Sequence, residues 1–270
     1  MTAMEKVRRF IRLVSWDQWD AIDAQYLGKP PPPGPWSHRG RTMWVLVTCA
    51  FVLSGLEYYG SRHFFRTTMP EWMRPHGYKQ LAEYIWWSGL CIFGYLAIPG
   101  LIVKGVFRER LTDYGFKATG FFKHLWVYGL LFLGVFPMVY FASLTEAFQK
   151  KYPFYKLSTR SLTDFFAWET AYSLQFVALE FFFRGFLLFG LARRFGSAAI
   201  PIMAVPYCMI HFGKPLPETI GAIGAGLVLG TIALRTGSIY AGILIHVAVA
   251  WSMDLLSLSH KGLLSKLFGG

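Results

Sequence analysis

The stretch FVALEFFFRGFLLFG, residues 176 to 190, decides the fold class because only Glu180 and Arg184 interrupt it with charge. With its neighbours it predicts a hydrophobic helix over residues 165–192, longer than the ~20 residues needed to cross a bilayer. A carboxylate and a guanidinium at that depth are costly unless they have partners inside the protein. The stretch therefore predicts a membrane helix that carries a buried polar pair.

Other apolar stretches along the chain indicate several more membrane helices. The 270 residues are 54% hydrophobic and 18% aromatic, above the ~45–50% apolar content of ordinary soluble domains. Because hydrocarbon cannot satisfy free backbone groups, the predicted fold is an all-α polytopic transmembrane bundle. We predict seven helices, or eight if a terminal helix re-enters the membrane. The seven cover residues 42–60, 83–106, 122–143, 165–192, 197–212, 217–234 and 238–258.

The first 35 residues are predicted to form a separate segment before the membrane domain, which covers residues 36–270. Residues 1–27 have the apolar spacing and basic residues of an amphipathic helix. Such a helix lies either on an anionic membrane surface or against its own domain. The run GKPPPPGP at 28–35 is typical of a stiff spacer.

The basic character of the chain fits a membrane protein better than a nucleic-acid-binding protein. The formal net charge is +12, which is typical of basic loops that face anionic lipid. We therefore expect the lipid bilayer as a partner and no nucleic acid. The distribution of Lys and Arg among the predicted loops favours a cytoplasmic N-terminus.

Ionisable residues at predicted membrane depth are concentrated between residues 165 and 258. Glu180 and Arg184 are four residues apart and share a helix face, either in a functional site or as a structural ion pair. His211 ends an apolar run just before a helix break, and irregular backbone at depth usually lines a cavity. His246 and Asp254 lie in the last predicted span.

Other residues of this region have structural interpretations. Glu218 falls in the first turn of a predicted helix, where the helix dipole favours an acid. Glu169 lies near the end of its span and is predicted to be interfacial. Gly226 and Gly230 are four residues apart, a spacing typical of helices that approach closely.

One glutamate, two histidines and an arginine are enough for a hydrolytic site. A carboxylate can take a proton from water, and imidazoles bind a metal or stabilise a developing oxyanion. The sequence has no H-E-x-x-H helix, no G-x-S-x-G elbow and no nucleotide-binding loop. The residues alone thus predict a membrane-embedded Glu/His/His site. A proton-relaying transporter is an alternative with the same polar residues, although no internal repeat supports it.

Three short motifs occur in order on three of the predicted spans. EFFFR supplies Glu180 and Arg184, YCMIH supplies Tyr207 and His211, and HVAVA supplies His246. Their order resembles E-E-x-x-x-R, F-x-x-x-H and H-x-x-x-N of the CPBP family of intramembrane proteases. This family contains CAAX prenyl endopeptidases and bacteriocin-processing proteins and is also called the Abi family. The resemblance covers about residues 165–258.

The resemblance implies an intramembrane endopeptidase that cleaves a protein C-terminal tail or a membrane-proximal peptide bond. Glu180 would be the general base or would polarise a metal, and Arg184 would orient it. His211 and His246 would bind zinc or another divalent metal, or stabilise the oxyanion, and Tyr207 would support the site. Similarity to prokaryotic members implies a multi-pass protein of the bacterial inner membrane. Its substrates would be membrane-associated proteins or peptides, such as sorting tails or peptide precursors.

Two positions depart from the family pattern. Leu179 stands where the family has its first glutamate, which is generally given the role of activating water, and Ala250 stands at the Asn position. Either Glu180 takes over as base, or the chain is an inactive relative that acts as a membrane immunity or scaffolding protein. Glu218 and Asp254 are the acids that would replace the missing carboxylate.

Overall fold

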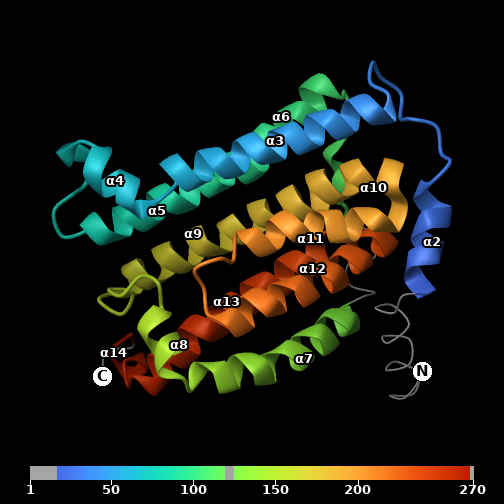
Figure 1. The fold of residues 1–270 in the computed structure, drawn as a ribbon. Coiled ribbons are helices and arrows are strands. Elements are labelled where there is room, and N and C mark those ends of the chain that lie inside the picture. Colours follow the sequence, from blue (N-terminus) through green and yellow to red (C-terminus); the bar gives the residue numbers. More distant parts are fainter. Residues whose placement is uncertain (1–16, 119–124, 268–270) are drawn as a thin grey trace. The chain divides into compact units, whose positions relative to one another are not determined.

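The computed structural model describes residues 17–118 and 125–267, and every regular element within them is a helix. No β-strand occurs in these two ranges, which confirms the predicted all-α fold (Figure 1). Most of the predicted N-terminal amphipathic helix, residues 1–16, lies outside the described residues. The remainder of that segment contains α2 (Asp17–Tyr26).

Six stretches of the described chain are helical, long and apolar enough to cross a membrane. They are His38–Tyr59, Lys79–Val106, Leu125–Ser143, Leu162–Met209, Leu216–Thr236 and Tyr240–His260. The first three and the last two agree with predicted spans to within a few residues. The fourth contains two of the predicted helices in one continuous stretch.

This fourth stretch consists of five elements joined end to end. They are α9 (Leu162–Glu180), the π-helix η6 (Phe181–Phe189), α10 (Gly190–Phe195), the 3₁₀ turn η7 (Gly196–Ala198) and α11 (Ala199–Met209). Gly196 has φ +56°, and a Cβ there would lie 2.1 Å from Oδ1 of Asp23, so only glycine fits the turn. That Oδ1 accepts a hydrogen bond from the Ser197 N–H at 2.6 Å. Beyond the turn α11 packs back against η6, so two separate helices are present, as predicted.

The other helices complete the chain in the order shown in Figure 1. Before the fourth stretch come α3 (His38–Tyr59), α4 (Arg62–Thr68), η1 (Glu71–Met73), α5 (Lys79–Ile92), η2 (Phe93–Ala97), α6 (Ile98–Leu101), η3 (Ile102–Val106), η4 (Leu111–Tyr114), α7 (Leu125–Ser143) and α8 (Glu146–Lys151). After it come α12 (Leu216–Thr236), α13 (Tyr240–His260) and α14 (Leu264–Leu267). The elements η2 and η3 are, like η6, π-helical.

The chain divides into two compact units, each assembled from three stretches of sequence. Unit 1 comprises Met1–Phe51, Ala97–Val127 and Glu180–Gly242, and unit 2 comprises Val52–Leu96, Tyr128–Leu179 and Ile243–Gly270. In unit 1, α11 and α12 run side by side (Figure 1). A Cβ on Gly226 would lie 3.2 Å from Cβ of Ala204, and one on Gly230 would lie 3.1 Å from the methyl group of Met203. The small-residue face of α12 therefore serves close helix packing, as predicted.

Unit 2 has an aromatic core. Its buried residues are Tyr84, Tyr155, Trp168, Tyr172 and Ala250. The rings of Trp168 and Tyr172, one helical turn apart on α9, stack with centroids 4.6 Å apart. Such aromatic contacts add to the burial of large apolar surface and hold α9 in a fixed rotational position.

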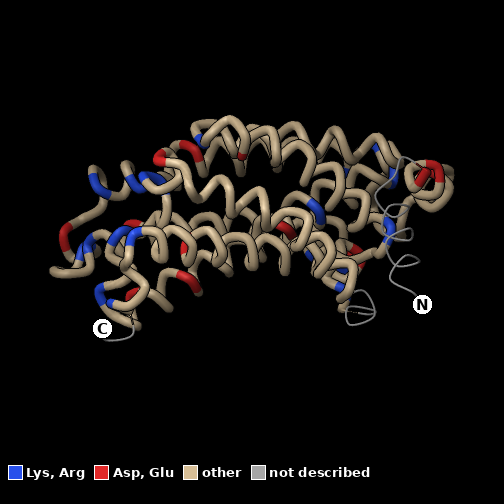
Figure 2. The backbone as a smooth tube through the Cα atoms, turned by 90° about the horizontal axis from the view of Figure 1, so that it is seen from below, with Lys and Arg blue, Asp and Glu red and all other residues tan. Residues whose placement is uncertain are grey.

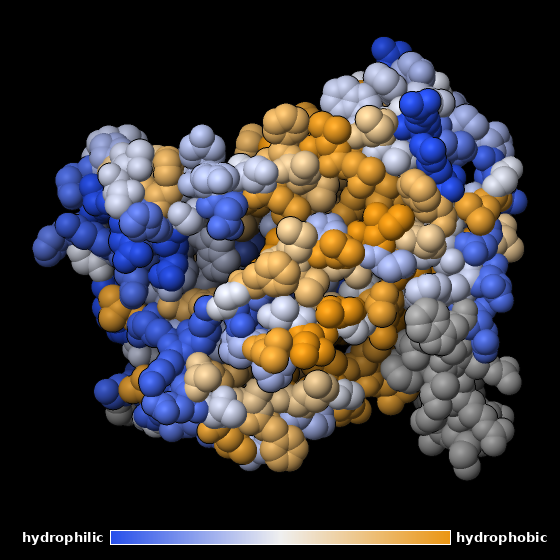
Figure 3. Space-filling view, viewed as in Figure 1, coloured by the Kyte–Doolittle hydropathy of each residue, from blue (hydrophilic) through white to orange (hydrophobic). Residues whose placement is uncertain are grey.

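The surface of the helices is that of a membrane protein. Large apolar side chains point outward, with Phe51 76% and Phe141 67% exposed, and hydrophobic residues are abundant on the face in Figure 3. Lys, Arg, Asp and Glu gather at helix ends and connecting segments, whereas long stretches of helix carry few (Figure 2). In water such surface would be a liability, but hydrocarbon solvates it. The chain is a multi-pass membrane protein.

Candidate functional site

The centre of the candidate site is an ion pair with no exposure to solvent. Glu180 is the last residue of α9 and Arg184 lies in the first turn of η6. Nη1 of Arg184 lies 3.0 Å from Oε1 of Glu180, and both side chains are 0% exposed. A buried ion pair is weak support for stability because desolvation offsets much of the attraction. A position at the junction of two helix types favours a functional role.

The π-helix at this junction was not predicted from the sequence. All nine residues of η6 are buried, including the three phenylalanines that directly precede Arg184. A π-helix closes i→i+5 hydrogen bonds in place of i→i+4, which changes the rotational position of each following side chain. Short π-helical segments occur often at functional sites. Here the wider turn begins immediately after Glu180.

Two residues of α11 and the turn that follows it extend the site. The guanidinium carbon of Arg184 lies 3.9 Å from the centroid of the Tyr207 ring, a cation–π contact that buries charge on an aromatic face. His211 lies in the turn beyond Met209, with its ring centroid 4.9 Å from that of Tyr207. The sequence thus correctly paired Glu180 with Arg184, and the structure places Tyr207 between Arg184 and His211.

The hydrogen bond of His211 determines which ring nitrogen carries its proton. Nδ1 lies 2.9 Å from the backbone oxygen of Tyr207. Because a carbonyl oxygen only accepts, Nδ1 must be the donor, and in the neutral ring Nε2 then keeps its lone pair. A histidine held in this way presents Nε2 as a base, an acceptor or a ligand.

Gly242 is a site residue that the sequence motifs did not reveal. It lies in the first turn of α13, and a Cβ at this position would be 2.0 Å from Oε2 of Glu180. No side chain fits between the α13 backbone and the carboxylate. Glu180 is therefore enclosed by Arg184 on its own helix and by the backbone of α13, and any shift of α13 would move the carboxylate.

The predicted third motif lies in unit 2. The His246 ring stacks on Phe176 of α9, with centroids 5.5 Å apart and planes 8° apart. Asp254 is fully buried and accepts a hydrogen bond of 2.8 Å from the indole N–H of Trp168. The pairs Trp168–Asp254 and Phe176–His246 show that α9 and α13 run antiparallel here. The place of His246 beside Glu180 stays a prediction.

The two positions that depart from the family pattern are both buried in unit 2. Leu179 is 7% exposed, and Ala250 is 3% exposed within the aromatic core. An asparagine at position 250 would have its amide among aromatic rings. The chain has thus used this position for packing.

Glu218 and Asp254, the acids considered as replacements, have other partners, and that of Asp254 is Trp168. Glu218 lies in the first turn of α12, and its Oε1 is 2.7 Å from Nζ of Lys214, so its helix-end role has a clear basis. Glu169 is 0% exposed and interacts with Asp254 in unit 2. Its predicted place near the membrane interface stays a prediction.

A metal site does not emerge from the histidines and acids of the described chain. Between residues 17–118 and 125–267, no three His, Cys, Asp or Glu side chains are grouped so that they hold a metal ion. Metal binding by His211 and His246 stays a prediction.

The match to known families coincides with the segment that carries this site. Residues 162–252 match the family model described as type II CAAX prenyl endopeptidase Rce1-like. We refer to residues 162–252 as the Rce1-like segment. The predicted resemblance to the CPBP family is thereby confirmed over these residues. No curated protein and no solved structure matches the chain.

The Rce1-like segment begins with the first residue of α9 and ends within α13. It contains Glu180, Arg184, Tyr207, His211 and His246, whereas Asp254 lies two residues beyond it. Because the matched family is a protease family, the match supports a protease in general.

Proposed function

We propose that this chain is an intramembrane endopeptidase that cleaves a membrane-associated protein near the bilayer, with Glu180 as general base. The observation that carries the proposal is the fully buried Glu180–Arg184 pair at the α9–η6 junction, within the Rce1-like segment. Membrane helices keep ionisable residues where they face a polar interior and serve a function. Glu180 is the acid of the first motif, and we assign to it the role of acting on water.

The proposed reaction is hydrolysis of one peptide bond. Glu180 takes a proton from water, and the resulting hydroxide attacks the carbonyl carbon of the substrate. The C–N bond then breaks, and the proton held by Glu180 passes to the leaving amine. Water and peptide are consumed, and a carboxylic acid and an amine are formed, which become a carboxylate and an ammonium when the acid proton passes to the amine.

Arg184 is the positioning residue of this proposal. Its guanidinium holds one carboxylate oxygen of Glu180 at 3.0 Å and is itself held over the Tyr207 ring. An arginine fixes a carboxylate better than a lysine does, because its guanidinium is always charged and can donate two parallel hydrogen bonds. Tyr207 thus supports Glu180 through Arg184 without contacting the substrate.

His211 and His246 are proposed to stabilise the oxyanion that forms on the carbonyl oxygen. For His211 the support is its ring, which Nδ1 holds on the Tyr207 carbonyl so that the protonated imidazolium offers Nε2–H as the donor; for His246 it is the third sequence motif. Donors aimed at the developing charge give the largest single contribution in acyl-transfer enzymes. No step is assigned to a metal.

The substrate class follows from the name of the matched family. Type II CAAX prenyl endopeptidases act, by their description, on prenylated tails. We propose that this chain acts on a peptide bond close to a membrane anchor, in a C-terminal tail or a peptide precursor.

Cleavage assays with matched variants test the proposal. We expect wild type to cleave membrane-anchored peptide tails and Glu180→Gln to lose about 10²–10⁴-fold in rate, the usual contribution of a general base. Glu169→Gln is the matched control, since Glu169 is another fully buried acid on α9. Similar losses in both variants would indicate a structural effect of burying an amide and would contradict the role of Glu180.

The inactive-relative alternative makes a distinct prediction in the same assay. Leu179 and Ala250 are the residues that favour it. If wild type is inert while Leu179→Glu gains cleavage, the chain has lost its chemistry and acts by binding. Metal content of the purified protein, measured in parallel with His211→Ala and His246→Ala, would assign or exclude histidine ligation.

A further inference from the structure

A cavity of about 440 Å³ lies in unit 1, and neither Glu180 nor Arg184 lines it. It is lined by Lys104, Arg108, Glu109, Arg110, Leu111 and Thr112. This volume is within the ~300–1,000 Å³ typical of small-ligand sites. The lining is unusual for its charge, since four of the six residues are ionisable.

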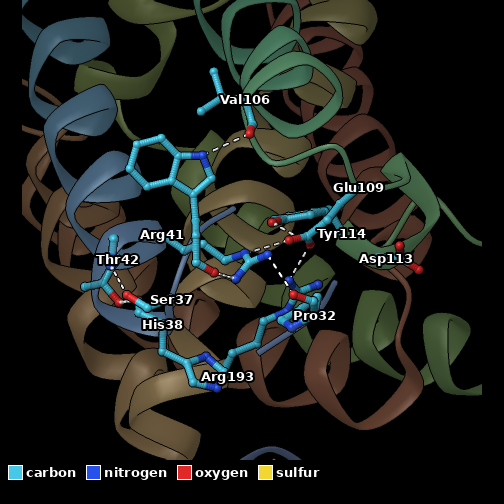
Figure 4. Close-up of polar contacts among 12 residues, drawn as sticks. Pro32, Ser37, His38, Arg41, Thr42, Val106, Glu109, Asp113, Tyr114 and Arg193 are labelled. Atoms are coloured by element: carbon cyan, nitrogen blue, oxygen red, sulfur yellow. Dashed lines mark hydrogen bonds and ion pairs between the residues drawn. The ribbon is translucent and has the colours of Figure 1, made fainter. Parts of the chain in front are cut away.

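The single acid of the lining is already neutralised by residues outside the cavity. Nε of Arg41 lies 2.7 Å from Oε1 of Glu109, and Arg193 pairs with Oε2. The hydroxyl of Tyr114 donates to the same Oε2 at 3.1 Å. Figure 4 shows these groups converging on Glu109, whose side chain is only 5% exposed. The carboxylate therefore adds little negative charge to the cavity.

The three cations of the lining are exposed and have no acidic partner among the described residues. Lys104, Arg108 and Arg110 all have exposed side chains, and none forms an ion pair within residues 17–118 and 125–267. Asp113 lies nearby, but its Oδ2 accepts the backbone N–H of Arg110 at 3.2 Å. Three uncompensated positive charges around one concavity favour an anionic ligand.

The backbone holds the central cation in a strained conformation. Arg108 has φ +60°, the single positive φ of a non-glycine residue in the described chain. The flanking amides are fixed, because Phe107 donates to Ile102 O and Glu109 to Val103 O, each at 2.9 Å. A strained arginine between two anchored residues indicates that its direction matters.

The position of the cavity along the chain places it at the edge of the bilayer. The second candidate span ends at Val106, between Lys104 and Arg108. The indole N–H of Trp36 donates to Val106 O at 3.0 Å, and the Trp36 and Trp44 rings meet edge to face. Tryptophans gather where hydrocarbon meets lipid headgroups. Leu101, 69% exposed one turn before Lys104, presents apolar surface on the hydrocarbon side.

We propose that Lys104, Arg108 and Arg110 bind the phosphate of an anionic phospholipid headgroup. Basic pockets at the ends of membrane helices take such headgroups, and guanidinium groups bind phosphate oxygens in pairs. The acyl chains of the lipid extend along the apolar surface near Leu101. A phosphate is the chemistry the pocket recognises, and the membrane is its source.

The test measures binding of fluorescent phosphatidylglycerol to the purified full chain in phosphatidylcholine–detergent micelles. The variant Lys104→Gln/Arg108→Gln/Arg110→Gln removes the three cations. We expect its affinity to fall about 100-fold, since each of the three basic residues contributes roughly 1 kcal/mol near an anionic surface. The control Lys29→Gln/Arg39→Gln/Lys117→Gln removes three exposed cations of the same unit from outside the pocket. It should change affinity less than threefold.

A second variant separates binding from folding. Arg108→Gly removes the charge and relieves the positive φ, so it should keep or raise thermal stability while weakening lipid binding. Equal losses in both triple variants would mean a diffuse electrostatic effect and would overturn the site. Competition by millimolar inorganic phosphate as effective as that by phosphatidylglycerol would overturn the lipid assignment. Glu180→Gln should bind the lipid as wild type does, so this result is independent of the proposed protease.

Discussion

At the scale of single residues, the Glu180–Arg184 pair has a defined geometry, although removing both charges from water costs free energy. Its spacing of four made the pair visible in the sequence, since i,i+4 residues share a helix face. Tyr207 and His211 were visible through the order of motifs. Gly242 was not, because its importance comes from a contact with Glu180 that joins residues far apart in sequence.

The ion pair makes a testable contribution to stability. Arg184→Gln leaves the buried Glu180 carboxylate without its charge partner, and we expect it to lower the free energy of unfolding by about 3–5 kcal/mol. Glu180→Gln/Arg184→Gln removes both charges and should lose clearly less. Unfolding in detergent micelles with increasing SDS measures both. If the double variant is the less stable of the two, the pair is not coupled in the way its 3.0 Å distance indicates.

Gly242 is predicted to be required both for packing and for cleavage. In Gly242→Ala the new methyl group meets Oε2 of Glu180, so α13 or the carboxylate must move. Overpacking of this kind costs about 1–3 kcal/mol, and cleavage should fall further than stability alone explains. Gly224→Ala on α12 is the control, because its Cβ would meet nothing within 4 Å. Full activity in Gly242→Ala would show that the carboxylate position is not critical.

At the scale of elements, the helices were predictable from apolar runs, but their irregularities were not. The π-helix η6 and the Gly196 turn depend on what packs around them: η6 on its buried phenylalanines, the turn on the Asp23 carboxylate. Neither leaves a periodic signal in the sequence. The contact between Glu169 and Asp254 escaped the sequence for the same reason, since Asp254 comes from another helix.

The short helix α2 is tied to unit 1 by a tyrosine whose ionisation should affect stability. The Tyr26 hydroxyl donates to Leu234 O at 3.2 Å, and burial raises the pKa of Tyr26 to about 12 although Arg193 and Arg235 oppose this. The unfolded chain loses this proton near pH ~10 and the folded chain two units later. Between these values the folded state binds more protons, so stability falls as pH rises, by at most ~1.4 kcal/mol per pH unit.

Tyr26→Phe removes the ionisable group, and its stability between pH 10 and 12 should decline less than that of wild type. Thermal unfolding in detergent across this range measures the difference. Tyr58→Phe, at a tyrosine that is 73% exposed, should leave the wild-type decline in place. An unchanged slope in Tyr26→Phe would mean that α2 leaves unit 1 before Tyr26 ionises.

At the scale of the whole molecule, composition alone predicted an all-α membrane protein, because hydrocarbon permits few other folds. Clusters that join distant stretches escaped the sequence. Glu109 meets Arg41 and Arg193, which lie 68 and 84 residues away, and no local pattern encodes such a meeting. Membrane orientation is different, since the distribution of Lys and Arg does encode it.

Labelling from the two sides of the membrane tests that orientation. The span Lys79–Val106 separates the exposed Glu71 from the exposed Lys117. In a chain whose three cysteines are replaced, Lys117→Cys should react from the cytoplasmic side and Glu71→Cys from the opposite side. An inverted pattern would contradict the predicted cytoplasmic N-terminus but would still show that this span crosses the membrane. Reaction of both from one side would show that this span does not cross the membrane. It would then also contradict the placement of the basic pocket at the level of the lipid headgroups.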